Sequence, residues 1–214
     1  MDFIANSSMW CAKQLVTKVP NTIYPSVEDQ IDVYSYGFMV VIGSLVKTTS
    51  LVILALVLGI LIPSLVIVAT FSSFRILAGG YHLKTAERCL IVSLIQFIGS
   101  ALIVQYTQKY WTYINIYSLF IFCVVIALYI IIKYVPRDTP NKPITDKLQV
   151  KKFKRWSFTY LLVWISIMIV FTLLNVKIIV IASCFGLLLE LFSISKLGQK
   201  IYKKLDTPNI LIIK

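Results

Sequence analysis

Histidine is almost absent from this sequence, and cysteine and acidic residues are scarce. The 214 residues include one histidine, four cysteines and nine aspartates or glutamates. A single histidine with scattered acids argues against a metal site, because zinc and similar ions need several such ligands at close spacing. We therefore expect neither a metal ion nor any other cofactor.

The four cysteines do not have the spacing of a disulfide framework, and no CxxC pair occurs. Cys123 and Cys184 lie inside apolar runs, where a cysteine usually acts as a small buried hydrophobe. Cys11 lies in an amphipathic stretch near the N-terminus. Cys89 differs from these three, because it follows His82 by seven positions within a polar segment.

Basic residues outnumber acidic ones, 21 against nine, which gives a formal net charge of +12. No nucleic-acid-binding motif accompanies this excess, so we expect no nucleic-acid partner. The chain is 58% hydrophobic with a mean hydropathy of +0.85, too apolar for a soluble globular protein. Several runs approach the roughly 20 apolar residues that span a bilayer. The sequence therefore predicts an integral membrane protein.

We expect an all-α, polytopic protein with about six transmembrane helices, forming a single membrane-embedded domain over residues 1–214. Residues 1–19 have the pattern of an amphipathic helix, which lies either on the membrane surface or against the protein's own core. The run 33–45 is short and ends at Lys47, so it either spans the bilayer or stays partly interfacial. The other predicted spans are 51–71 (kinked or locally broken at Pro63), 90–106, 114–132, 158–174 and 178–194.

The distribution of charge predicts the orientation. Basic residues gather in segment 75–89, in the loop 133–155 and in the C-terminal tail. The alternate connections carry one lysine each: Lys47, Lys109 and Lys177. Because cytoplasmic loops are enriched in lysine and arginine, both termini and segment 75–89 are expected at the cytoplasmic face of the cell membrane.

Residues Arg75–Cys89, RILAGGYHLKTAERC, form a polar insert between two apolar runs, here called the motif segment. An imidazole can accept a thiol proton near neutral pH, so His82 and Cys89 are the predicted catalytic pair of a cysteine protease. Seven residues of unbroken helix would separate them by about 10 Å along the axis. A hydrogen bond needs roughly 3 to 3.5 Å. Gly79 and Gly80 permit a sharp turn, so we expect His82 on a loop or a broken helix start folded back toward Cys89. Cys89 itself is expected near the start of the next helix.

The motif segment resembles the signature of the accessory gene regulator B (AgrB) family, and residues 134–144, YVPRDTPNKPI, resemble that family's next cytoplasmic loop. The family comprises membrane cysteine endopeptidases that process the autoinducing peptides of quorum sensing. The resemblance implies catalytic roles for His82 and Cys89, and functional roles for Arg75 and Gly80.

The same resemblance implies a substrate and a reaction. The substrate is a small precursor peptide with an amphipathic leader, a short core and an acidic C-terminal tail. The enzyme would remove the tail through a cysteine acyl-enzyme and cyclise the core to a thiolactone or lactone. A homodimer packed through membrane helices is implied as well.

Other polar residues are candidates for supporting roles. Backbone N–H groups at Gly79 and Gly80, or the guanidinium of Arg75, would stabilise an oxyanion; the glycines would serve equally as a tight turn, and Arg75 as a marker of the interface. Gln96 and Glu190 lie within spans and are candidates for lining a substrate cavity. A basic cluster either anchors the topology, docks the acidic tail or does both; it comprises Lys151, Lys152, Lys154 and Arg155.

The competing hypothesis is a non-catalytic membrane protein, either a small transporter or the sensor subunit of a signalling system. The spans contain few paired ionisable groups and no visible internal repeat. The sequence therefore favours the protease.

Overall fold

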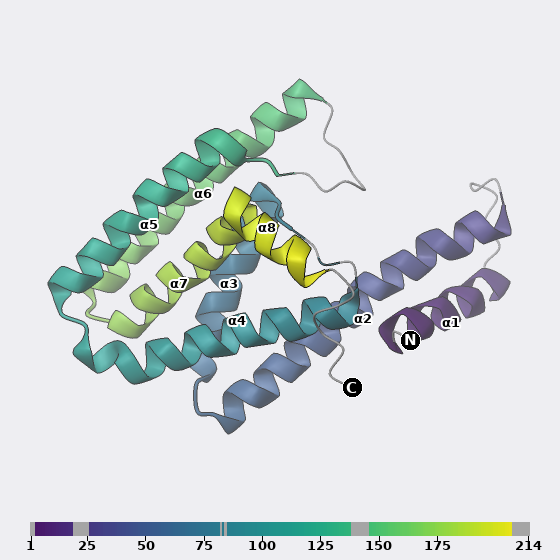
Figure 1. Ribbon diagram of the computed structural model, residues 1–214, viewed down its shortest axis with the longest axis horizontal. Coiled ribbons are helices and arrows are strands. Elements are labelled where there is room, and N and C mark those ends of the chain that lie inside the picture. The colour runs from purple at the N-terminus through teal and green to yellow at the C-terminus, as the bar shows by residue number, and fades with distance from the viewer. Residues whose placement is uncertain (1–2, 19–25, 82, 84, 138–145, 207–214) are drawn as a thin grey trace.

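The computed structural model describes residues 3–18, 26–81, 83, 85–137 and 146–206. These residues form α-helices joined by short connections (Figure 1). The helices are α1 (Phe3–Lys18), α2 (Val27–Val57), α3 (Leu61–Ala78), α4 (Ala86–Thr107), α5 (Tyr113–Tyr134), α6 (Lys147–Leu173), α7 (Lys177–Ile194) and α8 (Lys196–Leu205), with a 3₁₀ turn, η1 (Gln108–Tyr110), after α4.

Six helices in the described part of the chain are long and apolar enough to cross a membrane. They are α2, α3, α4 with its 3₁₀ extension, α5, α6 and α7. The predicted all-α, polytopic fold with about six spans and an N-terminal helix is therefore confirmed.

The boundary between the first two spans differs from the prediction. Helix α2 runs without interruption from Val27 to Val57, and its N-terminus is capped by Ser26, whose hydroxyl accepts a hydrogen bond from the Asp29 amide at 3.0 Å. The chain breaks at Gly59, which has a φ of 67°, a conformation that glycine adopts without steric cost. Pro63 then falls in the first turn of α3, where its missing N–H needs no helical partner.

This boundary corrects two predictions. The run 51–71 is divided between α2 and α3, and the break lies at Gly59, four residues before the predicted position at Pro63. Lys47 does not end a short first span, because it lies well inside α2. The connection between the first two spans is Leu58–Ile60, and it contains no lysine.

Helix α1 packs beside the N-terminal half of α2 (Figure 1). Its buried residues recur at every fourth position, which places them on one face of the helix: Ile4, Ser8, Ala12 and Val16. Phe3 and Trp10 stay exposed. The structure thus shows this face docked against α2, and a place for the exposed face on the membrane surface stays a prediction.

Helix α7 forms the centre of the bundle and contacts α3, α4, α5, α6 and α8. One apolar cluster joins it to α3, α5 and α6, and a second joins it to α2, α3 and α4. Gly186 permits close contact with α3, because a Cβ there would lie 2.5 Å from the Ile67 carbonyl oxygen. The C-terminal end of α7 is thereby fixed next to the end of α3, where the motif segment begins.

Helix occupies both ends of the basic region 133–155, up to Tyr134 in α5 and from Lys147 in α6. Helix α6 begins at Lys147, where the Asp146 carboxylate accepts a hydrogen bond from the Leu148 amide at 2.8 Å and caps the N-terminus. The predicted loop is thus shorter than expected, since long straight side chains such as Lys147 and Leu148 favour helix once a cap is present. Residues 138–144, most of the second family-like stretch, lie outside the described residues.

Candidate active site

Cys89 lies in the first turn of α4, as predicted from the sequence. Thr85 caps this helix: its hydroxyl accepts a hydrogen bond from the Arg88 amide at 3.3 Å, and its carbonyl accepts one from the Cys89 amide at 3.1 Å. The free N–H groups of a helix N-terminus carry a partial positive charge that favours an anion close by. The half-buried Cys89 thiol therefore lies at the positive end of this helix.

The described residues between α3 and α4 are not helical, which confirms the predicted break. Gly79 has a φ of 76°, and the described residues that follow it before Thr85 are Gly80, Tyr81 and Leu83. His82 lies outside the described residues. The pairing of His82 with Cys89 therefore stays a prediction, although its neighbours Tyr81 and Leu83 belong to the expected loop.

The two glycines are required by close contacts. The Arg137 amide donates to the Ala78 carbonyl at 2.8 Å, and a Cβ on Gly79 would overlap the Arg137 carbonyl oxygen. A Cβ on Gly80 would lie 2.6 Å from Nη1 of Arg75. These contacts bring the motif segment against the chain after α5, where the second family-like stretch begins. Packing thus accounts for both glycines, and an oxyanion role for their N–H groups stays a prediction.

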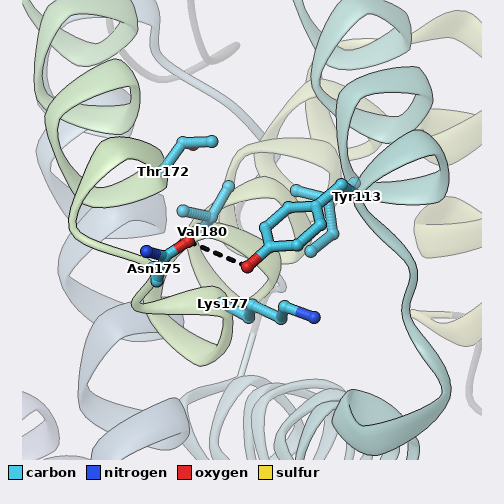
Figure 2. Close-up of a pocket in the computed structure, with 6 residues that line it drawn as sticks. Tyr113, Thr172, Asn175, Lys177 and Val180 are labelled. Atoms are coloured by element: carbon cyan, nitrogen blue, oxygen red, sulfur yellow. Dashed lines mark hydrogen bonds between the residues drawn. The ribbon is translucent and has the colours of Figure 1, made fainter.

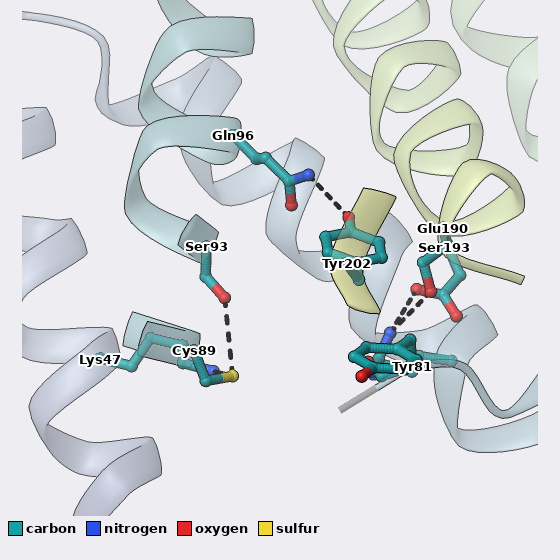
Figure 3. Close-up of polar contacts among 9 residues, drawn as sticks. Lys47, Tyr81, Cys89, Ser93, Gln96, Glu190, Ser193 and Tyr202 are labelled. Carbon is teal, nitrogen blue, oxygen red and sulfur yellow. Dashed lines mark hydrogen bonds and ion pairs between the residues drawn. The ribbon is translucent and has the colours of Figure 1, made fainter. Parts of the chain in front are cut away.

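Arg75 connects the motif segment to α7. Its Nη1 donates to Oε2 of Glu190 at 2.9 Å and to the Ser193 hydroxyl at 3.0 Å. Its Nη2 donates a short hydrogen bond to the carbonyl of Tyr81, the residue before His82. Figure 3 shows Tyr81 next to Glu190 and Ser193. The guanidinium thus holds the backbone at Tyr81, the residue before His82 in the sequence.

Glu190 is fully buried, and it forms the ion pair with Arg75. Its second oxygen, Oε1, has no hydrogen-bond donor among the described residues and lies 2.8 Å from the place a Gly80 Cβ would take. The structure therefore places Glu190 beneath the loop as the partner of Arg75. Its predicted role in lining a substrate cavity has no support from this packing.

Helix α8 holds the loop from the other side. The Tyr81 hydroxyl donates to the Asp206 carboxylate at 2.9 Å, and the Tyr81 ring stacks on Tyr202 with centroids 5.7 Å apart. Arg88 donates to the Asp206 carbonyl at 2.6 Å. Burial, with the hydrogen bond to Asp206 and its negative charge, raises the pKa of Tyr81 to about 12. Gln96 positions the Tyr202 ring on which Tyr81 stacks, since its amide donates to the Tyr202 hydroxyl at 2.6 Å.

Lys47 is the residue near Cys89 that sequence reasoning assigned elsewhere. Its Nζ lies 3.3 Å from the Cys89 sulfur, and the Ser93 hydroxyl lies 4.0 Å from the same atom (Figure 3). The prediction had placed Lys47 and Cys89 on opposite faces of the membrane. This is corrected by the uninterrupted α2, which carries Lys47 to the end of the bundle where α4 begins.

The predicted basic cluster lies in the first turns of α6. Lys154 donates to the Ile132 carbonyl at 2.6 Å and so binds the end of α5. Lys152 lies over the Trp156 ring, 5.0 Å from its centroid. Lys151, Lys152 and Arg155 are exposed. Lys154 thus has a structural contact, whereas the other three project to the surface.

A small cavity lies at the end of the bundle opposite to Cys89. Figure 2 shows the residues that line it. It is lined by residues from the start of α5, the end of α6 and the start of α7, and the Tyr113 hydroxyl donates to Asn175 Oδ1 at 2.8 Å beside it. Helix α4 alone separates this end from Cys89 by about 30 Å at 1.5 Å per residue. A volume of about 10 Å³ holds roughly one water molecule, so the cavity does not accommodate a peptide.

The fold and this arrangement define a multi-pass membrane protein. The Cys89 thiol lies at one end of its helical bundle, beside Lys47 and next to the segment at Tyr81 that Arg75 and α8 hold. The sequence model of the accessory gene regulator B family matches residues 12–194. The chain therefore belongs to the AgrB family and takes part in the accessory gene regulator quorum-sensing system.

Individual relatives agree with this assignment. An AgrB-like protein of Clostridium perfringens (strain SM101 / Type A) is 25% identical over 186 residues, covering 82% of this chain and 86% of the relative. Accessory gene regulator protein B of Staphylococcus intermedius is 34% identical over 119 residues, 55% of this chain and 59% of that protein. The same protein of Staphylococcus lugdunensis is 30% identical over 116 residues, 54% and 58% of the two chains. No solved structure matches the chain.

Proposed function

We propose that this protein is a membrane cysteine endopeptidase and peptide cyclase. It cleaves the acidic C-terminal tail from a small precursor peptide and closes the core into a thiolactone or lactone. The observation that carries the proposal is the position of Cys89, in the first turn of α4 and seven residues after His82 in the sequence. Membership of the AgrB family supports it.

The first half of the reaction forms an acyl-enzyme. His82 accepts the Cys89 proton, and the thiolate attacks the carbonyl carbon at the end of the core. The carbon–nitrogen bond then breaks, and the leaving amine takes the proton held by His82. The tail departs, and the core stays bound to Cys89 as a thioester.

The second half closes the ring. A cysteine or serine side chain within the core attacks the thioester carbonyl and displaces the Cys89 thiolate. Exchange of one thioester for another is nearly isoenergetic, so the acyl-enzyme keeps the activation that hydrolysis would discard. A half-buried thiol favours this outcome, because excluding water protects the thioester while the internal nucleophile is held near.

Arg75 would act as a positioning residue in this scheme. Its guanidinium is occupied by Glu190, Ser193 and the Tyr81 carbonyl, which directs it toward the backbone next to His82. A loop fixed on both sides by Arg75 and by α8 would hold the imidazole in one orientation. Precise orientation of a base can contribute several powers of ten to a rate.

We further propose that the end of the bundle carrying Cys89 faces the cytoplasm. The connections at the opposite end are 58–60, 108–112 and 174–176, and the charged residues there are Lys109 and, at the first position of α7, Lys177. With Lys47 transferred to the Cys89 end, the asymmetry of basic residues is larger than the sequence alone suggested. The exposed Lys151, Lys152 and Arg155 would then attract the acidic tail at the same face.

The test uses purified enzyme in lipid vesicles with a synthetic precursor peptide, followed by mass spectrometry. We expect a covalent adduct on Cys89 that has lost the tail, and then release of a cyclic core. Cys89→Ala and His82→Ala should each abolish cleavage while the protein still accumulates in the membrane, and Cys11→Ala serves as the matched control. Normal cleavage by Cys89→Ala would refute the proposal.

A further inference from the structure

Lys47 is an isolated charge in an apolar part of the chain. It is the sole charged residue between Asp32 and Arg75, and it lies in the helix that forms the first span. A lysine in such a position is costly unless its ammonium finds water or a partner, so intramembrane lysines usually mark functional sites. Its contacts therefore indicate its role.

The contact that the structure gives the Lys47 ammonium is with sulfur. Nζ lies 3.3 Å from Sγ of Cys89, and both residues are half-buried. Within the described part of the chain, no carboxylate lies within ion-pair distance of this ammonium. A lysine held for its charge alone would gain more from a carboxylate than from a neutral thiol, which is a weak hydrogen-bond acceptor.

We propose that Lys47 is a catalytic residue whose ammonium stabilises the Cys89 thiolate, both as the attacking nucleophile and as the leaving group in ring closure. This inference rests on the proposed peptidase function and extends it to a third group. The lysine keeps its proton throughout. His82 remains the base, and Lys47 provides a fixed positive charge beside the atom that gains and loses negative charge.

The charge on sulfur appears twice in each turnover. In acylation, the Cys89 proton passes to His82, the sulfur–carbon bond forms, and the carbon–nitrogen bond breaks with that proton passing to the amine. In ring closure, the internal nucleophile gives its proton to His82 and bonds to the thioester carbon. The sulfur–carbon bond then breaks, its electron pair returns to Sγ, and the thiolate again faces Nζ.

The N-terminus of α4 alone would provide less positive charge beside the Cys89 sulfur. It contributes about half of a positive elementary charge, spread over several N–H groups. A lysine ammonium contributes a full charge at one point, 3.3 Å from the sulfur. Because thiolate stabilisation also reduces intrinsic nucleophilicity, only part of the gain in thiolate population appears in the rate of the first step. The benefit to the leaving group in ring closure has no such offset.

The test compares Lys47→Met, which keeps the length and removes the charge, with Lys47→Arg, which keeps the charge. Lys109→Met, at the opposite end of the bundle, is the matched control. Alkylation of Cys89 by iodoacetamide at neutral pH is followed by mass spectrometry, with Cys11 as the reference thiol in the same molecule. We expect Lys47→Met to slow Cys89 alkylation about tenfold relative to Cys11. Lys47→Arg should restore most of the rate, and Lys109→Met should match the wild type.

Peptide cleavage and ring closure give the second measurement. We expect Lys47→Met to lower kcat at an unchanged KM, and to slow ring closure more than tail release, so that the acyl-enzyme accumulates. Wild-type alkylation and kcat in Lys47→Met would overturn the inference. A raised KM with wild-type alkylation would also overturn it, because Lys47 would then bind the acidic tail.

Two further controls keep the outcomes separate. If Lys47→Met fails to accumulate in the membrane, Lys47→Gln takes its place, and a short reagent that joins amines to thiols is applied to the wild type. Linkage of Lys47 to Cys89 is expected, and linkage of Cys89 to other lysines instead would refute the geometry. Full cleavage by Cys89→Ala would reject the peptidase itself, whereas loss in Cys89→Ala with an unaffected Lys47→Met would reject the role of Lys47 alone.

Discussion

The ion pair between Arg75 and Glu190 should support both the stability of the bundle and the position of the catalytic loop. Glu190→Gln keeps the shape of the side chain and removes its charge, so Arg75 loses the carboxylate 2.9 Å away. At that separation and an effective dielectric constant of about 20, the attraction is at most about 6 kcal/mol. Breaking a buried pair typically costs about 3 to 5 kcal/mol. Because the Arg75 side chain is 19% exposed, we expect the lower end, about 3 kcal/mol.

The measurement is thermal unfolding of the purified protein in detergent. For a chain of this size, about 3 kcal/mol corresponds to a fall in Tm of roughly 10 °C. The matched control is Glu28→Gln, which removes an exposed carboxylate at the start of α2 and should change Tm by little more than a degree or two. Equal Tm values for wild type and Glu190→Gln would show that the pair contributes no net stability.

A double variant separates stability from positioning. Arg75→Met with Glu190→Met removes both charges, and such apolar replacements of a buried pair are often neutral or stabilising. It also removes the hydrogen bond from Arg75 to the Tyr81 carbonyl. We therefore expect Tm to recover while peptide cleavage stays at least tenfold below the wild type, because the loop that carries His82 has lost its anchor. Recovery of both Tm and cleavage would refute the positioning role of Arg75.

Two further predictions concern the loop and the basic surface. Because the pKa of Tyr81 is raised to about 12, its phenol stays protonated at pH 10, where a free tyrosine ionises. The contribution of the Tyr81 hydrogen bond to stability should be complete below pH 10 and lost between pH 10 and 12. The tyrosinate absorbance of the wild type minus that of Tyr81→Phe should rise only toward pH 12. Replacing Lys151 and Lys152 with glutamine should raise KM for the precursor a few-fold at low salt and much less at 0.5 M salt, whereas Lys109→Gln should leave KM unchanged, and an equal effect at both salt concentrations would contradict electrostatic docking.

Sequence periodicity was enough to predict the fold, because hydrophobic runs of membrane length have few alternatives to spanning helices. It placed Cys89 at a helix start and the helix break at the glycine pair, since the cues for both are local. The boundary at Gly59 was missed because Pro63, four residues later, is the stronger breaker in a sequence and yet is tolerated in the first turn of a helix.

Partners distant in the sequence could not be predicted, because they depend on how the helices pack. Arg75 and Glu190 are 115 residues apart, and Tyr81 and Asp206 are 125 apart. Lys47 carried one usable signal, a single charge within an apolar stretch. A first span that ends at Lys47 explains the same charge as a topological marker instead.

Three polar residues inside the spans follow one rule that explains the location of the site. A polar group in an apolar medium costs several kcal/mol unless it is paired. Lys47, Gln96 and Glu190 come from three different helices, and each finds its partner next to the motif segment: the Cys89 sulfur, the Tyr202 hydroxyl and the Arg75 guanidinium. Water cannot easily replace these partners within the bundle. The contacts that make the spans tolerable in lipid are therefore the same contacts that fix the nucleophile and its loop, and substitutions among them should affect folding and catalysis together unless charge and shape are changed separately.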